Sequence, residues 1–187
     1  MSDEILAWNE LAPLLAPIHD DAQLFARRIA GSNAEGDDVF QEAVLRAVRK
    51  LSTLRDRERF EAWMHAIIVS VHRSRWRRGF WRRWISRDDV PPAFEPTGDD
   101  GSRWVDERAS ARRATAALAT LSPPQREAIV LFELQGYSID EIAEIQRTSV
   151  SSVKSRLVRA RERLRSFYAK LDHAPQPAAS IEEVCRG

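Results

Sequence analysis

The chain has 187 residues, of which 43% are hydrophobic and 30% are charged, and its formal net charge is +1. This balance is typical of a globular protein and excludes a largely disordered chain. The only cysteine is Cys185, which excludes an intrachain disulfide and a Cys-based zinc cluster. No apolar run approaches the roughly twenty residues that span a bilayer, and the acidic start MSDEILAWNE is unlike a signal peptide. We therefore expect a cytoplasmic protein with no membrane span.

Helical periodicity extends over most of the chain and strand-like alternation is scarce, which predicts an all-α fold. Charge is segregated along the sequence. Residues 71–87 contain seven arginines and no acid, whereas residues 88–107 contain seven acids against Arg103 alone. The acidic stretch is also rich in Pro and Gly and is typical of a linker. We predict two small helical domains, 1–86 and 109–171, joined by a flexible acidic linker, 87–108, and followed by a flexible tail, 172–187.

In the first domain the clearest element is a helix over Asp37–Lys50. Its apolar residues recur at helical spacing and predict one buried stripe, made of Phe40, Ala43, Val44, Ala47, Val48 and Leu51. The opposite face carries Asp38, Gln41, Glu42, Arg46 and Arg49. Because Glu42 and Arg46 are spaced i,i+4, the simplest interpretation of this face alone is a solvated surface with internal ion pairs.

A second helix of this domain is expected to open near Phe60, after a short polar loop. Its expected core residues are Phe60, Trp63, Ile67, Ile68 and Val71. His65 and His72 share a face of this helix, but two histidines without a third ligand are more often solvated or at the edge of a core than bound to a metal.

The segment Ser74–Arg87 interleaves tryptophans with arginines. Such side chains can stack on bases and neutralise phosphates, or contact a protein that acts on DNA. They can also pack on the domain while the arginines stay in water. A third alternative is contact with an anionic membrane surface or with a protein inhibitor. The sequence leaves these alternatives open.

The second domain is predicted to contain a helix-turn-helix. Ser122, Pro123 and Gln125 are typical of a helix start, and Gly136 of its end. Ser138 and Glu141 then form a capping box for a short helix, and Ser149 begins the next one. The buried stripe of this last helix is expected to contain Val150, Val153, Leu157, Ala160 and Leu164.

The other face of that helix carries short hydroxyls and long cations, which suit close approach to DNA and contact with phosphates or guanine edges. The predicted DNA-binding residues are Ser151, Ser152, Lys154, Ser155, Arg156, Arg159 and Arg161. A solvated amphipathic hairpin is the alternative. Between Arg147 and Arg165, however, seven cations face the single acid Glu162, so few internal partners compete with DNA.

The run LSPPQREAIVLFELQGYSIDEIAE, followed by SVSSVKSRLVRARERLR, resembles the promoter-reading domain of bacterial sigma factors, in particular the extracytoplasmic-function (ECF) group. The turn departs from the family's usual Leu-Gly-Ile-type step, since this chain has Gln146-Arg147-Thr148. Without glycine, the turn must have a different shape, or Arg147 must accept strain in exchange for a phosphate contact.

The segment AEGDDVFQEAVLRAVRKL also resembles the ECF pattern, in which the polar face binds the clamp coiled coil of RNA polymerase. The resemblance implies polymerase contacts at Asp38, Gln41, Glu42 and Arg46. It further implies that the loop Leu54–Arg59 and the next helix read the −10 element. The candidate −10 contacts are Arg55, Arg57, Arg59, Arg73, Arg75 and Arg77. The family's usual Arg-Asn pair is replaced here by Val69-Ser70.

Together these features predict an ECF-type sigma factor that binds core RNA polymerase and promoter DNA at the −10 and −35 elements, with an anti-sigma factor as a further expected partner. Neither a cofactor nor an enzymatic activity is expected, because no catalytic motif is present. Two alternatives remain. One is a sigma-like decoy that titrates an anti-sigma factor, and the other is a stand-alone helix-turn-helix regulator, which would typically dimerise on a palindrome.

Overall fold

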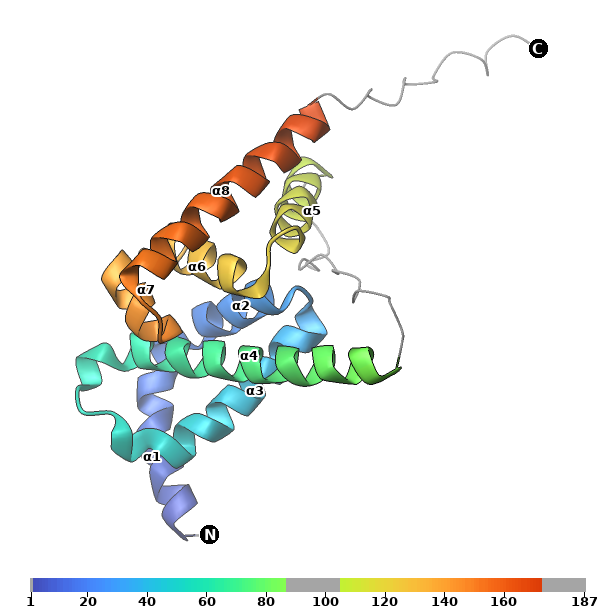
Figure 1. Ribbon diagram of the computed structural model, residues 1–187. Coiled ribbons are helices and arrows are strands. Elements are labelled where there is room, and N and C mark those ends of the chain that lie inside the picture. The colour runs from blue at the N-terminus through green and yellow to red at the C-terminus, as the bar shows by residue number, and fades with distance from the viewer. Residues whose placement is uncertain (1, 87–104, 173–187) are drawn as a thin grey trace.

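The computed structural model describes residues 2–86 and 105–172, and all regular elements in these ranges are helical, as predicted. The helices form two groups (Figure 1). The first contains α1 (Ser2–Leu15), α2 (His19–Ala30), α3 (Asn33–Lys50) and α4 (Phe60–Ser86), with 3-10 turns at Ala16–Ile18, Leu51–Thr53 and Arg57–Arg59. The second contains α5 (Val105–Ala119), α6 (Pro123–Glu133), α7 (Ile139–Gln146) and α8 (Val150–Asp172).

The predicted linker and tail fall mostly outside the described residues. Because α5 begins at Val105, residues 105–108 are helical, although the sequence analysis placed them in the linker. At the other end, α8 continues to Asp172. None of the described helices combines the length and the apolar character that crossing a membrane requires.

Helix α3 begins four residues before the predicted start. Ser32 caps it, because the Ser32 hydroxyl accepts a hydrogen bond from the Glu35 amide at 3.2 Å. The preceding helix ends at Gly31, whose φ of 98° is favourable only for glycine. The chain therefore turns sharply between α2 and α3, and the two helices pack closely side by side.

Gly36 lies where α3 meets α2. A Cβ atom on Gly36 would lie 2.3 Å from the Cα of Arg27, so a side chain at this position would force the helices apart. Beside this contact, the Arg27 guanidinium donates two hydrogen bonds to the Asp37 carboxylate, at 2.8 and 3.0 Å. These bonds hold the pKa of Asp37 below its ordinary value. The close packing of α2 against α3 is thus fixed by the absence of a side chain at Gly36 and by the Arg27–Asp37 ion pair.

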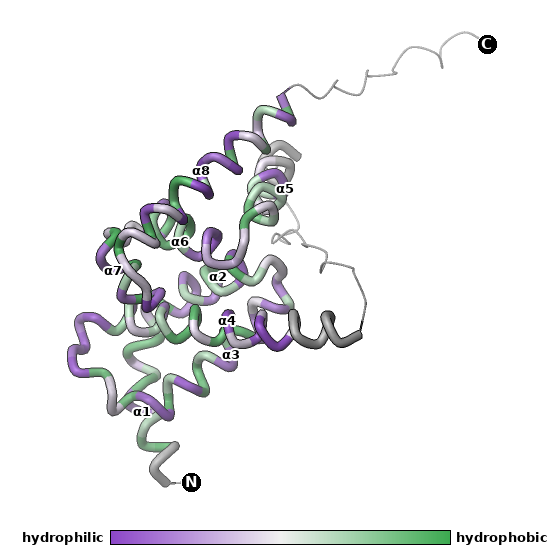
Figure 2. The backbone as a smooth tube through the Cα atoms, viewed as in Figure 1, coloured by the Kyte–Doolittle hydropathy of each residue, from purple (hydrophilic) through white to green (hydrophobic). Residues whose placement is uncertain are grey.

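The core of the first group follows the predicted stripes. Phe40, Ala43 and Ala47 of α3 are buried, and Val44, Val48 and Leu51 are partly buried. On α4, the predicted core residues Phe60, Ile67, Ile68 and Val71 are buried, whereas Trp63 is only partly so. The apolar stretches lie along the inside of the bundle (Figure 2).

The second group also follows the predicted local signals. Ser122 with Gln125 and Ser138 with Glu141 form capping boxes at the starts of α6 and α7. Gly136 has a φ of 72° in the turn between these two helices. On α8, Val153, Leu157 and Ala160 are buried, while Val150 and Leu164 are partly buried. The helix-turn-helix is therefore built as the sequence predicts.

The two groups pack directly against each other, which the sequence analysis did not foresee. Helix α7 lies on α4, and α6 lies on α2 (Figure 1). The buried apolar residues of both groups form one continuous cluster. The surfaces predicted to contact DNA and polymerase therefore belong to one compact body with a shared core.

Candidate nucleic-acid interface

The turn between α7 and α8 sets the direction of the recognition helix. Arg147 adopts a left-handed conformation with φ 49° and ψ 58°, and its amide donates to carbonyl oxygens at the end of α7. The Ser149 hydroxyl then accepts a hydrogen bond from the Ser152 amide at 3.2 Å. Arg147 thus occupies a conformation that glycine adopts at less cost.

A pocket of about 400 Å³ opens between the N-terminus of α6 and the first turns of α8. It is lined by Ser122, Pro124, Gln125, Ser151, Ser152, Ser155, Arg156 and Arg159. Five of the predicted DNA-binding residues are therefore brought together, with hydroxyl and guanidinium groups side by side. This combination suits a phosphate or a base edge.

The cations of α8 differ in their surroundings. In the described part of the chain, Lys154 and Arg159 are exposed and make no ion pair. Arg161, in contrast, pairs with Glu133 at 2.8 Å and lies over the Phe132 ring, 5.2 Å from its centroid. The sequence predicted a face with few internal partners. Arg161 has such a partner, whereas Lys154 and Arg159 remain available for DNA.

Arg156 is held within the protein. Its Nη1 donates to the Gln146 side-chain oxygen at 2.6 Å, and its Nη2 lies 3.5 Å from the Thr148 hydroxyl. Burial lowers the pKa of the guanidinium, with a smaller contribution from nearby Arg73. The Arg156 side chain is therefore oriented before any DNA is bound, which reduces the entropy it would lose on contact.

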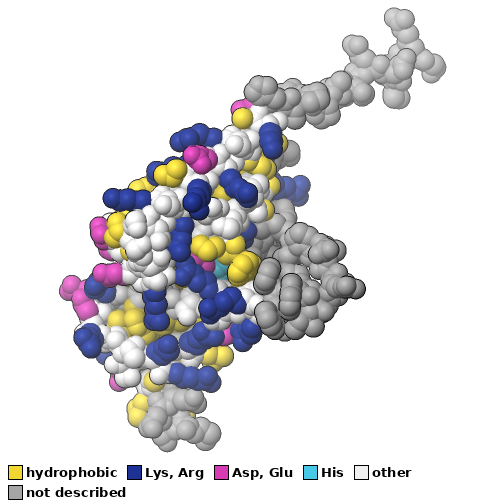
Figure 3. Space-filling model, viewed as in Figure 1, with side chains coloured by type: hydrophobic (Ala, Val, Ile, Leu, Met, Phe, Trp, Pro, Cys, Tyr) yellow, Lys and Arg dark blue, Asp and Glu magenta, His cyan; other side chains and the backbone are white. Residues whose placement is uncertain are grey.

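On the face seen in Figure 3, Lys and Arg side chains gather along α8 and continue over the first group of helices. Besides Arg73, which is described below, three candidate −10 residues already have carboxylate partners. Arg57 lies 3.6 Å from Glu10, and Arg59 pairs with Glu144 of α7 at 3.0 Å. Arg75 donates to Asp38 at 2.9 Å. Arg55 and Arg77 are exposed.

The predicted polymerase face of α3 forms a continuous charged surface. Glu42 accepts a hydrogen bond from Arg46 at 2.6 Å, as the i,i+4 spacing predicts. Arg75 and Arg78 of α4 also approach Glu42, at 3.5 and 3.7 Å. Asp38 and Gln41 are exposed beside this cluster. The structure therefore brings the four predicted polymerase residues together and adds two arginines from α4.

A deeper charged cluster joins the two groups. The fully buried Glu127 carboxylate of α6 accepts hydrogen bonds from His72 Nδ1 at 2.9 Å and from Arg73 Nε at 2.8 Å. A second nitrogen of Arg73 donates to the same carboxylate at 2.6 Å. The side-chain nitrogen of Gln146 donates a fourth hydrogen bond to it, at 3.2 Å. Arg73 also donates to the Gln146 carbonyl oxygen at 2.6 Å. Sequence reasoning placed Arg73 on a DNA surface and missed Glu127.

Arg126, the neighbour of Glu127, also connects the two groups of helices. Its guanidinium donates to the carbonyl oxygen of Ile29 near the end of α2, at 3.2 Å, and to those of Leu118 and Leu121. Burial lowers the Arg126 pKa. The two charges directly precede the apolar run Ala128–Phe132 of α6, and a charge that is buried beside such a run requires a partner.

The two histidines of α4 are buried, whereas the sequence analysis expected core-edge or solvated positions. His65 packs against Phe25 and its Nδ1 lies 2.9 Å from the Tyr137 hydroxyl. Burial lowers the pKa of His65 to about 4. Among the residues described, His, Cys, Asp and Glu form no group of three that could hold a metal ion.

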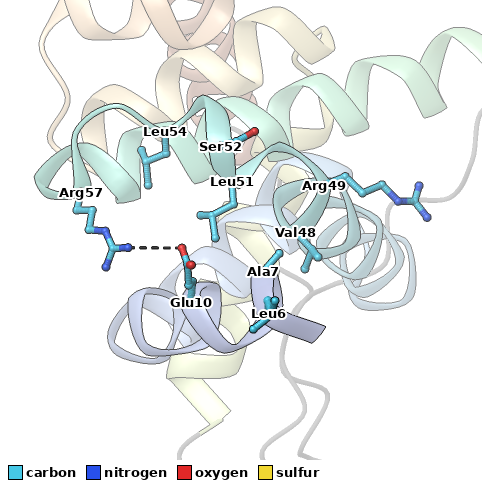
Figure 4. Close-up of a pocket in the computed structure, with 9 residues that line it drawn as sticks. All are labelled: Leu6, Ala7, Glu10, Val48, Arg49, Leu51, Ser52, Leu54 and Arg57. Atoms are coloured by element: carbon cyan, nitrogen blue, oxygen red, sulfur yellow. Dashed lines mark ion pairs between the residues drawn. The ribbon is translucent and has the colours of Figure 1, made fainter. Parts of the chain in front are cut away.

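Two further grooves border the first group. One, of about 290 Å³, lies between the candidate −10 loop and α7, and Arg59, Trp63, Glu141 and Glu144 are among its lining residues. The other, of about 580 Å³, lies between α1 and the end of α3. Figure 4 shows its mostly apolar walls and the Glu10–Arg57 ion pair at its mouth.

Only part of the Trp/Arg-rich segment is described. Trp76 is 41% exposed, so this tryptophan is not packed into the core. Arg75 and Arg78 contact the acidic residues of α3. The side chains of Trp81 and Trp84 lie outside the described residues.

Comparisons with known proteins match both groups of helices. Residues 18–82 match the family model of sigma-70 region 2, and residues 111–164 match that of sigma-70, region 4. The ECF RNA polymerase sigma factor SigM of Mycobacterium tuberculosis is 32% identical over 146 residues, which cover 78% of this chain and 70% of SigM. EcfG of Rhodopseudomonas palustris is 30% identical over 159 residues, which cover 81% of this chain and 85% of EcfG. SigE of Mycolicibacterium smegmatis is 30% identical over 178 residues, but this chain spans only 65% of its length.

Solved structures show the same arrangement of helices. The sigma factor RpoE of Bartonella quintana, in complex with the anti-sigma factor NepR, superposes with a TM-score of 0.69 at 23% identity, covering 86% of this chain and 97% of RpoE. CnrH, in complex with the cytosolic domain of CnrY, gives a TM-score of 0.60 at 26% identity, and the match covers 94% of this chain and 100% of CnrH. With both regions matched in order along one chain, this protein belongs to the ECF group of the sigma-70 family of RNA polymerase sigma factors.

Proposed function

We propose that this chain directs promoter recognition and transcription initiation by binding core RNA polymerase and the −10 and −35 elements. The observation that carries the proposal is the presence in one chain of a region-two-like and a region-four-like domain, the second of which exposes Lys154 and Arg159 on a recognition helix. A stand-alone helix-turn-helix regulator would not require the charged face of α3.

The −35 element is assigned to the pocket between α6 and α8. Its serine hydroxyls permit a close approach, and the oriented Arg156 guanidinium can donate to O6 and N7 of a guanine. Lys154 and Arg159 would neutralise phosphates on either side. The −10 element is assigned to the loop Leu54–Arg59 and to the arginines that begin with Arg73.

Core polymerase is assigned to the exposed face of α3, where Asp38, Gln41, Glu42 and Arg46 lie together. A face of mixed charge suits a partner with a complementary pattern, because paired charges fix orientation and register. We further propose a cytoplasmic location, where polymerase and the chromosome are found, and a non-catalytic role. We also propose control by an anti-sigma factor, because the structural neighbour RpoE is bound by the anti-sigma factor NepR.

The test is in vitro transcription with purified core polymerase and a library of random promoter sequences. We expect transcripts only when the chain is added, from templates that share two short elements at fixed spacing. DNA binding without core polymerase, at a palindrome, would instead support a stand-alone regulator. Tight binding to an anti-sigma factor with no transcript from any template would support a decoy.

A further inference from the structure

The candidate −10 arginines of α4 do not share one face of the helix. Successive residues of an α-helix are about 100° apart around its axis, so Arg75 and Arg77 lie on nearly opposite sides. Arg75 and Arg78 follow Ile68 and Val71 at steps of three and four residues, and they continue this buried stripe toward the end of the helix. The stripe faces α3. Arg77 is exposed on the other side.

Arg75 connects two carboxylates of α3. Its Nη2 donates to Oδ2 of Asp38 at 2.9 Å, and its Nη1 lies 3.5 Å from Oε2 of Glu42. Asp38 and Glu42 are one helical turn apart, and like charges at this spacing repel each other. The guanidinium between them offsets this repulsion. Because its nitrogens are fixed in one plane, it also sets the direction in which both carboxylates point.

The members of this charged cluster differ in exposure. Arg46 donates to Oε1 of Glu42 at 2.6 Å, and Arg78 lies 3.7 Å from the same oxygen. The side chains of Arg75 and Glu42 are 31% and 28% exposed, whereas that of Asp38 is 61% exposed. The Arg75–Glu42 pair is thus held within the protein, while Asp38 remains accessible to a partner.

The contacts of Arg75 are unfavourable for DNA binding by this residue. To reach a phosphate, the guanidinium would have to leave both carboxylates, and the phosphate would then lie beside two negative charges. A protein partner does not require this exchange. Asp38 and Glu42 can accept hydrogen bonds from a partner while Arg75 stays in place, and side chains that are already oriented lose less entropy on binding.

We propose that Arg75 is a positioning residue of the polymerase face and not a contact of the −10 element. It holds the carboxylates of Asp38 and Glu42 in the orientation in which core polymerase binds them. This inference rests on the proposed function. It moves Arg75 from the −10 surface to the polymerase face and leaves Arg77 on the −10 surface.

The test compares Arg75→Gln with Arg77→Gln. The second change removes a guanidinium of the same helix that makes no ion pair within the described residues. Titration measures the affinity for purified core polymerase. Promoter binding is measured with saturated holoenzyme, on a −10 fragment recovered from the random library and on its single-base variants. Arg75→Gln should lower the affinity for core polymerase about fivefold or more and leave discrimination among the −10 variants unchanged. Arg77→Gln should weaken promoter binding and leave the affinity for core polymerase unchanged.

A double-mutant comparison determines whether Arg75 acts through the two carboxylates. In a chain that carries Asp38→Asn and Glu42→Gln, Arg75→Gln should cause no further loss of affinity for core polymerase. Arg75→Lys should recover only part of the wild-type affinity, because an ammonium group lacks the planar fork that orients both carboxylates. Circular dichroism checks the folding of each variant, and Arg75→Lys replaces Arg75→Gln in the comparison if the latter does not fold.

Four results would overturn the proposal. These are wild-type affinity for core polymerase in a folded Arg75→Gln chain, full affinity in Arg75→Lys, altered −10 discrimination by the saturated Arg75→Gln holoenzyme, and an equal loss of affinity when the two carboxylates are absent. The last result would mean that Arg75 contacts the polymerase by itself.

Failure of the proposed function would give a different result. A wild-type chain that does not bind core polymerase would refute that function. Binding that is weakened by Glu42→Lys but not by Arg75→Gln would leave the function intact and refute only the positioning role of Arg75.

Discussion

The Nη1 of Arg156 in the recognition helix donates a hydrogen bond of 2.6 Å to the side-chain oxygen of Gln146 at the end of α7. The amide nitrogen of the same Gln146 donates to Glu127 and to the Pro124 carbonyl oxygen. A single glutamine thereby connects the candidate base-reading arginine to the buried cluster between the domains. Its side chain is only 1% exposed, so its orientation is fixed.

Replacing Gln146 by leucine should therefore weaken both stability and base discrimination. The change leaves Glu127 and Arg156 without one hydrogen-bond partner each, which should lower the free energy of unfolding by about 1–3 kcal/mol. With holoenzyme and a panel of single-base −35 variants, discrimination should fall at the base pair that Arg156→Ala also affects. Unchanged discrimination in a folded Gln146→Leu protein would show that Arg156 needs no support from α7.

Alanine substitutions of Arg156 and Arg159 should have different kinds of effect on DNA binding. Arg156→Ala should cost roughly 1–3 kcal/mol on the preferred −35 sequence and relax discrimination at one base pair. Arg159→Ala should weaken all sequences alike and reduce the slope of log affinity against log salt by about one. Measurements at two salt concentrations distinguish the two effects. Equal, sequence-independent losses in both variants would indicate that the helix holds the backbone without reading bases.

Reversing the charge of Glu42 should weaken the association with core polymerase. In the wild type, Glu42 lies among Arg46, Arg75 and Arg78, so Glu42→Lys would gather four cations on the proposed polymerase face. We expect a loss of about 2 kcal/mol or more if the carboxylate is desolvated in the complex. Titration of core polymerase gives the affinity, and circular dichroism checks the helix content. If neither Glu42→Lys nor Arg46→Glu changes the affinity for core polymerase, this face does not bind the polymerase.

His65 should make the stability of the chain depend on pH. Burial lowers its pKa from the ordinary 6.5 to about 4 in the folded state. Between these values the unfolded chain binds more protons at this site, so the folded state loses stability as the pH falls below 6.5. Urea unfolding should show a loss from this residue of about 2 kcal/mol between pH 7 and pH 5. His65→Gln should lack this component, while the contribution of the carboxyl groups remains. Equal losses in the wild type and His65→Gln would contradict the prediction.

Arg147→Gly should have opposite effects on stability and on DNA binding. Glycine adopts the left-handed conformation of this residue without strain, and the gain is partly offset by the greater freedom of glycine in the unfolded chain. We expect the free energy of unfolding to rise by up to about 1 kcal/mol. If Arg147 contacts a phosphate, affinity should fall equally for all sequences, with a shallower salt dependence. A more stable variant with full affinity would mean that this arginine has no role in binding.

The sequence predicted those features that depend on residues close together in the chain. Both capping boxes, the stripe through Val153 and Leu157, and the Glu42–Arg46 pair follow from spacings of three or four residues, which a helix converts directly into contacts. The early start of α3 was missed because the cap at Ser32 precedes a stretch, Asn33–Gly36, with no strong apolar periodicity.

The features that were missed join distant parts of the chain. Arg73 and Glu127 are 54 residues apart, and periodicity carries no information on which arginine of a basic run will face which carboxylate. The same limit applies to His65 and Tyr137, at a separation of 72 residues. The resemblance to a family supplied the two domains and their proposed surfaces, but not their packing against each other.

The continuous buried cluster of the two domains has a consequence for how the chain unfolds. Ile29 and Phe25 of the first domain belong to the same apolar core as Leu131 and Ile142 of the second. Neither half can lose its structure without exposing part of the other half's core to water, which couples the two transitions. Heating should thus produce a single cooperative calorimetric peak, with a van't Hoff enthalpy equal to the calorimetric one, and the melting temperature of the intact chain should exceed that of either half prepared alone.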